Sequence, residues 1–238
     1  MRNYLIYNGV STADFCVEVS GTNTFGSAEP DYEVVSIQGR AGDLFIDHGR
    51  YKNAELTYTC LLQKDFDRNF RGLKGKLLKS PGYHRLEDSF HPEEYRMAII
   101  SGSIDPSMAV RLREGTFDIT FNCKPQRYLK SGEQVITLTA SGKIYNPTDF
   151  DAKPLIRVYG SGELGVGDKI ITISTTDAYT DIDCETGEAY MNDSSNNRNS
   201  NVTIPGHVYP VLAGSEATGI TLGTGITKVE ITPRWWIL

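Results

Sequence analysis

The chain has 238 residues, of which 39% are hydrophobic and 23% charged, a composition typical of a folded globular protein with one large or two modest domains. Its formal net charge of -6 argues against a surface that binds nucleic acid through an excess of basic residues, so we expect no sequence-specific nucleic-acid partner. No apolar run reaches the length of about 20 residues that a bilayer requires, and no apolar leader opens the chain, so we expect synthesis in a cytoplasm without membrane insertion.

The N-terminal part is predicted to form a sheet. Apolar and polar residues alternate at 3–7 and 15–20, and again on both sides of a glycine-rich connection within 34–62. Alternation with a period of two indicates strands with one buried face. We therefore expect residues 34–62 to form a half-buried strand pair without catalytic residues. The glycines that shape its connection are Gly39, Gly42 and Gly49.

A change of period then predicts an α-helix over about residues 65–79. Asp65 is the expected N-cap, and the Ser-Pro-Gly sequence at 80–82 is the expected stop. Because Gly72 and Gly75 each lower helix stability by roughly 0.5–1 kcal/mol relative to alanine, packing against the sheet must hold this helix. The apolar positions that recur at helical spacing are Phe66, Phe70, Leu73 and Leu77.

Further strands follow the helix. Strand patterns at 83–87 and 94–101 are separated by a polar turn that contains a proline, which predicts a hairpin or projecting arm with an apolar run at 97–100. Residues 117–123 alternate most regularly, so we expect a strand with one face in the core and the other in solvent.

Beyond about residue 132, short strand patterns between glycine and asparagine clusters favour a β-sandwich. The expected fold is therefore mainly β: an N-terminal β domain at 1–135 with one helix and a projecting hairpin, then a β-sandwich at 136–238. Residues 192–201 are too polar to pack and predict an exposed loop. The strands predicted for the second domain are 135–139, 154–159, 169–174, 179–182, 188–191 and 228–232.

Motifs of catalysis or cofactor binding are weak. The four cysteines are widely spaced and lack histidine partners, which predicts reduced, buried thiols rather than a zinc site or disulfides. Residues 160–165 match the dinucleotide pattern GxGxxG, but the β-branched run at 169–173 follows where that site needs a helix. We interpret the glycines as a strand connection, and we expect no enzyme activity and no cofactor.

One acidic cluster leaves two chemical alternatives open. Asp181, Asp183 and Glu185 resemble part of a calcium loop. That loop lacks its last acidic ligand and is flanked by strands, so residues 185–187 favour a hairpin turn, and no metal is expected. The same carboxylates could serve a cell-wall hydrolase, which would require a cleft and a raised pKa.

Aromatic residues suggest a different alternative, a carbohydrate-binding module for host cell-wall glycans. Trp235, Trp236 and Tyr190 are the candidates for stacking on sugar rings, with Tyr179 and Tyr209 as further possibilities. Adjacent strand residues point to opposite faces, so at most one of the two tryptophans could stack on a sugar while the other packs in the core or an interface.

Several segments together resemble a known family, the distal tail (Dit) proteins of long-tailed phages or prophages of Gram-positive bacteria. The resemblance begins with the GRAGDL sequence at 39–44 and GRYKN at 49–53. It continues through GTFDITFNCKPQRYL at 115–129 and NPTDFDAKPLIRVYGSG at 146–162, and it ends with YTDIDCETGEAY at 179–190 and ITPRWWIL at 231–238. The similar segments keep their order and spacing over nearly the whole chain.

This resemblance implies a galectin-like second domain and a hexameric ring that forms the hub of a phage baseplate. In the family, the ring joins the tail tube protein to the tail-associated lysin or tail fibre, holds receptor-binding proteins, and leaves a central channel open for DNA. The expected location is the tail tip of the virion, after assembly in the host cytoplasm. Candidate contacts between subunits are Met97, Ile99, Ile100, Arg40, Asp43, Arg50 and Lys52.

Overall fold

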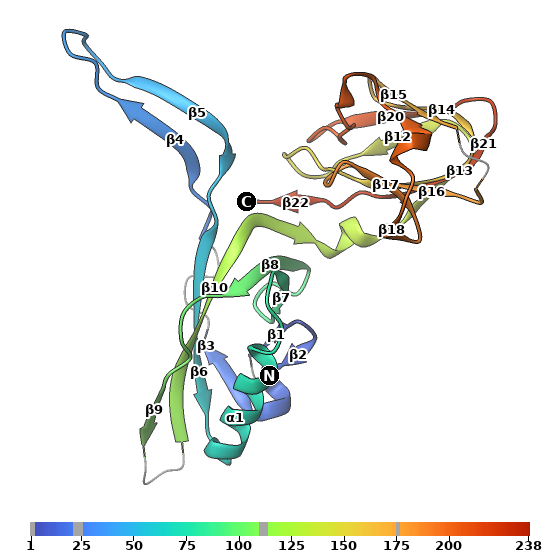
Figure 1. Cartoon of the computed structure of the whole chain (residues 1–238). Coiled ribbons are helices and arrows are strands. Elements are labelled where there is room, and N and C mark those ends of the chain that lie inside the picture. Colours follow the sequence, from blue (N-terminus) through green and yellow to red (C-terminus); the bar gives the residue numbers. More distant parts are fainter. Residues whose placement is uncertain (1–2, 21–25, 110–113, 175–176) are drawn as a thin grey trace. The chain divides into compact units, whose positions relative to one another are not determined.

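The computed structural model describes residues 3–20, 26–109, 114–174 and 177–238, and within these ranges the chain is mainly β with one α-helix (Figure 1). It divides into two compact units, the first comprising Met1–Arg127 with Leu238 and the second comprising Tyr128–Ile237. Each unit has its own hydrophobic core. The domain boundary between residues 135 and 136 stays a prediction.

Unit 1 is built on one large sheet. Its strands are β1 (Leu5–Tyr7), β2 (Val10–Ser11), β3 (Val17–Ser20), β6 (Ala54–Leu62), β7 (His84–Asp88), β8 (Glu94–Ile100), β9 (Pro106–Ala109) and β10 (Glu114–Leu129), with a 3-10 turn η1 (Thr12–Phe15). The order across the sheet is β2-β1-β7-β8-β10-β6-β3, and β9 also pairs with β10. The regular alternation around Phe117 and Phe121 is explained by the register, because these residues face Cys60 and Leu56 of β6 on the buried side.

The helix α1 (Phe66–Leu77) packs on this sheet with all four predicted apolar residues buried. The Phe70 ring meets Phe117 edge-on, with 5.0 Å between centroids. Phe66 lies over Gly115, where a Cβ atom would come within 2.3 Å of the ring, so a larger residue at this position would have to displace Phe66. Burial of each large apolar side chain contributes about 1.5–3 kcal/mol, which explains how a helix with two glycines is held.

The predicted role of Asp65 is only partly correct. Asp65 occupies the N-cap position, but its backbone is left-handed (φ 46°) and its side chain makes no capping hydrogen bond. The Asn69 side chain instead donates a hydrogen bond of 2.8 Å to the Lys64 carbonyl at this end of the helix.

The hairpin predicted over 83–101 exists as β7 and β8, but it is not a projecting arm. β8 lies between β7 and β10 inside the sheet, and Ala98 is completely buried. The apolar run at 97–100 therefore belongs to a strand with neighbours on both sides. The prediction was wrong because strand pairing, which the alternation of one segment does not reveal, decides which hairpin is covered.

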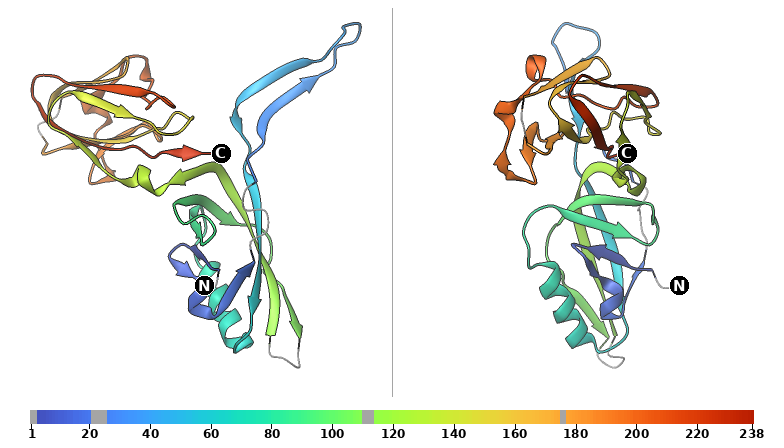
Figure 2. Two further views of the ribbon diagram at one scale, coloured as in Figure 1. Left: turned by 180° about the vertical axis from the view of Figure 1, so that it is seen from behind. Right: turned by 90° about the vertical axis from the view of Figure 1, so that its right-hand side faces the viewer.

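The projecting hairpin consists of β4 (Pro30–Val35) and β5 (Leu44–Tyr51), which form a two-stranded sheet with each other. In Figure 2 this pair extends beyond the large sheet of unit 1. The sequence predicted instead that the first alternating run within 34–62 would pair with the second. That prediction is wrong, because β5 lies between them and the second run, β6, pairs with β3 and β10.

Unit 2 is a β-sandwich. Its strands are β11 (Ile136–Leu138), β12 (Gly142–Tyr145), β13 (Leu155–Gly160), β14 (Gly162–Val166), β15 (Lys169–Ile173), β16 (Thr180–Asp183), β17 (Glu188–Met191), β18 (Asp193–Asn197), β19 (Val202–Thr203), β20 (Ala217–Leu222) and β21 (Ile226–Thr232), with short 3-10 turns η2 (Lys130–Glu133), η3 (Asn199–Asn201) and η4 (Pro205–His207). The short strand β22 (Trp236–Ile237) belongs to neither sandwich sheet. One sheet has the order β11-β21-β13-β16-β17-β18, and the other has the order β12-β20-β14-β15-β19. Buried residues such as Ile156, Leu164 and Ile171 fill the core between them.

Two local predictions for unit 2 can be compared with the structure. The glycines at 160–165 connect β13 to β14, as predicted, and Gly160 (φ 100°) lies so close to Gly225 that a Cβ atom would be 2.1 Å from its carbonyl oxygen. The polar segment 192–201 is mostly exposed, as predicted, but it is not a simple loop. It contains β18, which pairs with β17, and the Asn199 side chain accepts a hydrogen bond from the Ala189 amide.

Candidate functional site

The β4–β5 hairpin and its connecting turn, called the arm (residues 30–51), expose large apolar side chains on both faces. On one face Tyr32, Val34 and Phe45 are 45%, 52% and 60% exposed, and the rings of Tyr32 and Phe45 are 5.0 Å apart. On the opposite face Leu44 and Ile46 are also exposed. A lone two-stranded hairpin is at best marginally stable in water. An apolar patch of this kind marks a surface for interaction with another molecule.

The tip of the arm is a glycine-shaped turn. Gly39 and Gly42 both adopt φ of 82°, a conformation that favours glycine. Asp43, one of the predicted contact residues, accepts a 2.9 Å hydrogen bond from the Ser36 hydroxyl, and the side chain of Arg40 is exposed nearby. The tip therefore exposes one arginine, Arg40, on a turn that is stabilised by the hydrogen bond between Ser36 and Asp43.

At the base of the arm, charged side chains pair across the two strands. Arg50 Nε donates to Asp31 Oδ2 at 2.6 Å, and His48 Nδ1 lies 3.3 Å from Asp31 Oδ1. The hydrogen bond from Arg50 is the main reason that the pKa of Asp31 lies below its ordinary value. Lys52 pairs with Glu29 at 3.4 Å. The predicted contact residues Arg50 and Lys52 thus also have partners within their own chain.

The other predicted contact residues lie on β8. Met97, Ile99 and Ile100 are half-buried, and Ile100 packs against the core of unit 1. They lie in the large sheet of unit 1, whereas the arm residues lie in the separate β4–β5 sheet. Their role in contacts between subunits stays a prediction.

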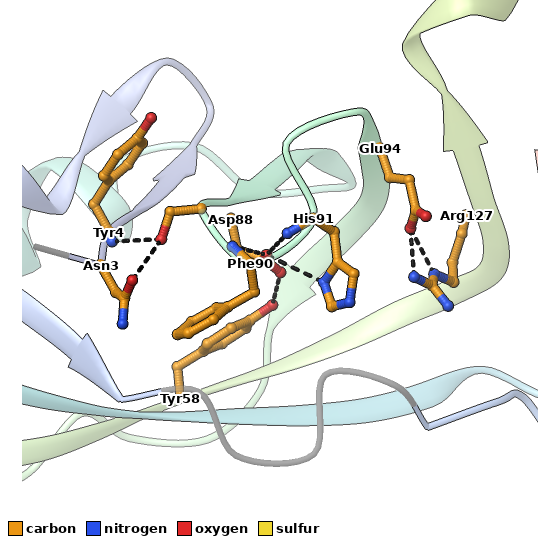
Figure 3. Close-up of polar contacts among 9 residues, drawn as sticks. Asn3, Tyr4, Tyr58, Asp88, Phe90, His91, Glu94 and Arg127 are labelled. Carbon is orange, nitrogen blue, oxygen red and sulfur yellow. Dashed lines mark hydrogen bonds and ion pairs between the residues drawn. The ribbon is translucent and has the colours of Figure 1, made fainter. Parts of the chain in front are cut away.

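The turn between β7 and β8 carries a polar network (Figure 3). The Asp88 carboxylate accepts hydrogen bonds from the Tyr58 hydroxyl at 2.7 Å and from the backbone amides of Phe90 and His91 at 2.9 and 2.8 Å. Glu94 is held by Arg127, whose Nε donates at 2.8 Å. The adjacent cavity of about 10 Å³ has room for only one water molecule, so this cluster holds the hairpin and offers no space for a substrate.

The acidic cluster of unit 2 is engaged by arginines. Arg157 forms two hydrogen bonds to Asp181, and Arg234 forms two to Asp183. Burial raises the pKa of Asp183, but the hydrogen bonds from Arg234 and from the Glu185 backbone outweigh it and lower the pKa overall. Residues 185–187 form the predicted hairpin turn between β16 and β17. Among the described residues, no three histidine, cysteine or acidic side chains are placed to hold a metal ion.

The three main aromatic candidates of the carbohydrate alternative, Trp235, Trp236 and Tyr190, lie in different surroundings. Trp235 is 5% exposed and belongs to the core of unit 2. Trp236 stacks on Phe150 with centroids 4.4 Å apart, and its indole N–H donates to the Asp151 carbonyl. Tyr190 is half-buried on β17, opposite Asp181. A shallow cavity of about 180 Å³ lies nearby, lined by residues that include Leu155, Arg157 and Glu230.

The buried thiols match the sequence prediction. Cys60, Cys123 and Cys184 are buried and unpaired by disulfides, and Cys16 is half-buried. Burial raises the pKa of Cys60 to about 12, so this thiol is protonated at neutral pH and unreactive. None of the helices in the described part of the chain is long and apolar enough to span a bilayer.

Sequence reasoning missed β5, the strand that makes the arm. The signal was present, since the apolar run Leu44–Ile46 directly follows the Gly42-Asp43 turn, as in a hairpin. The apolar run then ends at Asp47, and the polar and glycine residues at 47–50 concealed the rest of the strand.

Comparison with solved structures places this fold among phage tail proteins. The crystal structure of the Dit protein of phage SPP1, described as a paradigm of the hub adsorption apparatus in phages that infect Gram-positive bacteria, matches with a TM-score of 0.74 and 14% identity over 100% of both chains. Structures of the phage P2 baseplate in its activated conformation, with Ca and with Sr, each match with a TM-score of 0.55 and 10% identity over 97% of both chains.

No protein-family model and no curated protein matches the sequence. At identities of 10–14% the solved structures establish the fold of the chain, which is similar to that of the SPP1 Dit protein over the whole length of both chains. The predicted resemblance to distal tail proteins is confirmed at this level, as is the mainly β fold with one helix and a second-domain sandwich. A projecting hairpin is present as well, but it is formed by β4 and β5 and not by the predicted residues 83–101.

Proposed function

We propose that this chain is a structural hub of a phage tail tip, which assembles into a hexameric ring and acts without catalysis or a cofactor. The observation that carries the proposal is the match over 100% of both chains with a hub protein of the adsorption apparatus. The exposed apolar arm supports the same proposal, because it needs a partner to cover it.

The proposed ring joins the tail tube protein to the tail-associated lysin or tail fibre, holds receptor-binding proteins, and leaves a central channel for DNA. It is assembled in the host cytoplasm and resides at the tail tip of the virion. The net charge of -6 per chain is consistent with a channel through which DNA slides without being bound, because phosphate binding requires an excess of basic residues.

The arm is the proposed contact between neighbouring subunits. A ring closes when one surface of each copy meets a different surface of the next copy. The exposed faces around Phe45 and Leu44, with Arg40 and Asp43 at the tip and Arg50 and Lys52 at the base, would form one of these two surfaces. Met97, Ile99 and Ile100 on β8 are proposed to contribute to the second.

The mass of the purified protein in solution tests this function. Six copies of the 26.4 kDa chain would give a particle of about 158 kDa by light scattering. Electron microscopy of the same sample would show rings with an open centre. A monomer at every accessible concentration would contradict the proposal.

The carbohydrate-binding alternative has one supporting observation, the shallow cavity on the outer face of the first sandwich sheet. The half-buried Tyr190 lies on a neighbouring strand of that sheet, whereas Trp235 is in the core. A monomer that binds purified cell-wall glycan, and loses this binding when Tyr190 is changed to alanine, would favour the alternative over the hub.

A further inference from the structure

The arm contains a break in its strand register. Asp31 of β4 faces Arg50 of β5, yet the next residue, Tyr32, faces Asp47. The two residues between, His48 and Gly49, are therefore outside the ladder and form a bulge. A bulge bends its strand and increases the local twist, so this one sets the direction of the outer part of the arm.

The bulge is held from both strands. Gly49 adopts φ of 65°, and its amide donates a 2.9 Å hydrogen bond to the Asp47 side chain. Across the ladder, one Asp31 oxygen lies 3.3 Å from His48 Nδ1, and the other accepts the 2.6 Å hydrogen bond from Arg50 Nε. One carboxylate thus contacts both the bulged residue and the residue that resumes the ladder.

Asp31 also differs from its surroundings in burial. It is 8% exposed, whereas Tyr32 is 45% and Val34 is 52% exposed, although all three belong to one strand. A buried carboxylate in an exposed hairpin is costly unless its partners satisfy it. Here it has two partners, His48 in the bulge and Arg50 next to it in the ladder. This arrangement indicates that the bent form of the arm is fixed before any partner arrives.

We propose that Asp31 is a positioning residue for assembly, which clamps the His48–Gly49 bulge so that the apolar faces of the arm meet a second copy of this chain at the angle that closes the ring. The inference rests on the proposed ring. Head-to-tail contacts close into a ring only when the rotation between copies is correct, and otherwise they continue as open chains. A wrong bend should therefore give assemblies of wrong or mixed size, which mere loss of stability would not produce.

The most direct test removes His48 and Gly49 together. Deleting two residues keeps the alternation of β5, so the apolar side chains of the arm stay on their faces while the bulge disappears. We expect the monomer to keep its unfolding midpoint in urea, whereas native mass spectrometry should show open or mixed oligomers in place of a uniform hexamer. A uniform hexamer from the deletion variant would overturn the inference.

If the deletion variant does not fold, point variants test the positioning role of Asp31 instead. Asp31→Asn removes the charge of the clamp, and Glu163→Gln, at an exposed carboxylate on β14 of unit 2 outside both proposed contact surfaces, is its matched control for charge. We expect the concentration of half-assembly to rise at least about tenfold for Asp31→Asn and to stay unchanged for Glu163→Gln. Equal effects of the two variants would overturn the inference.

The two proposals fail in different ways. If the wild-type chain forms no ring, the hub proposal is wrong, and the positioning role of Asp31 falls with it. If the wild-type chain forms a uniform ring and both the deletion and Asp31→Asn do so equally well, the hub stands and only the positioning role is wrong.

Discussion

The two hairpins of unit 1 are built alike and end in opposite environments. Both β7–β8 and β4–β5 are antiparallel pairs, and in each an aspartate fixes the local backbone: Asp88 accepts amide hydrogen bonds in the turn of the first, and Asp47 does so in the bulge of the second. Yet Leu86 on β7 is 2% exposed, whereas Phe45 on β5 is 60% exposed. The difference comes from the neighbours, because the β7–β8 hairpin is flanked by β1 and β10, while β4 and β5 pair only with each other in the described chain.

This contrast separates two uses of apolar surface. On β7 and β8 the apolar side chains contribute to folding, because the sheet and the core cover them. On the arm they contribute little to the isolated chain, and their burial would contribute to assembly instead. Substitutions in the two hairpins should therefore affect different equilibria.

The largest expected effect is on folding. Leu86→Ala should lower the free energy of unfolding by about 2–5 kcal/mol, because it leaves a cavity in a packed core. Phe45→Ala should change it by less than about 0.5 kcal/mol, because the ring is largely exposed in the isolated chain. Urea unfolding at a concentration where the chain is monomeric measures both. Similar losses for the two variants would contradict the distinction between the hairpins.

The next effect is on assembly. Replacing Val34 and Phe45 together by serine should raise the concentration of half-assembly at least about a hundredfold, because the exposed apolar face of the arm is lost. Sedimentation velocity over a dilution series gives this concentration. The same experiment with Met97→Ser and Ile99→Ser tests the proposed second surface on β8. A hexamer that persists in both double variants would contradict the proposed contacts.

A smaller effect on unfolding free energy is expected when a tyrosine hydroxyl is removed beside the β7–β8 hairpin, but not when one is removed from the arm. Tyr58→Phe removes the hydroxyl that donates to Asp88 and should cost about 1 kcal/mol of unfolding free energy. Tyr32→Phe removes a hydroxyl from an exposed ring of the arm and should leave unfolding unchanged. Chemical denaturation of the two variants side by side measures the difference, and an equal cost would show that the Asp88 network does not matter for stability.

The smallest effect concerns pH. The pKa of Asp31 is lower in the folded arm than in an unfolded chain, chiefly because of the hydrogen bond from Arg50. Its stabilising effect is therefore present above the unfolded value of about 4 and is lost as the pH falls through the lower folded value. Hexamer content of the wild type should decline in this acidic range, and Asp31→Asn should lack that part of the decline. Identical pH profiles for the two proteins would contradict this assignment.

Local patterns predicted much of the fold. The helical spacing of Phe66, Phe70 and Leu73 predicted α1, since one face of a helix must be apolar to be buried. The β-branched run at 169–173 predicted a strand after the glycines at 160–165, and β15 (Lys169–Ile173) confirms it. Neither conclusion depends on distant parts of the chain.

The candidate site was predicted less well. The glycines of the arm were recognised as shaping a connection, but β5 was missed and the arm was assigned to residues 83–101. An alternating segment fits a covered strand and an exposed one equally well, so the sequence pattern cannot separate β8 from β5. In addition, the bulge at His48 and Gly49 interrupts the strand pattern by which β5 could have been recognised in the sequence.

By itself the sequence determined the mainly β character, the single predicted helix, the strand connection at 160–165 and the resemblance to distal tail proteins. The first three follow from periodicity and from the conformations that glycine and proline permit, which act over a few residues, whereas the resemblance rests on the order and spacing of similar segments along the chain. Which hairpin is covered by neighbouring strands became visible only in the three-dimensional fold, as did the contacts of Asp31 with His48 and Arg50. The reason is that strand pairing joins distant segments and thereby determines what each side chain contacts.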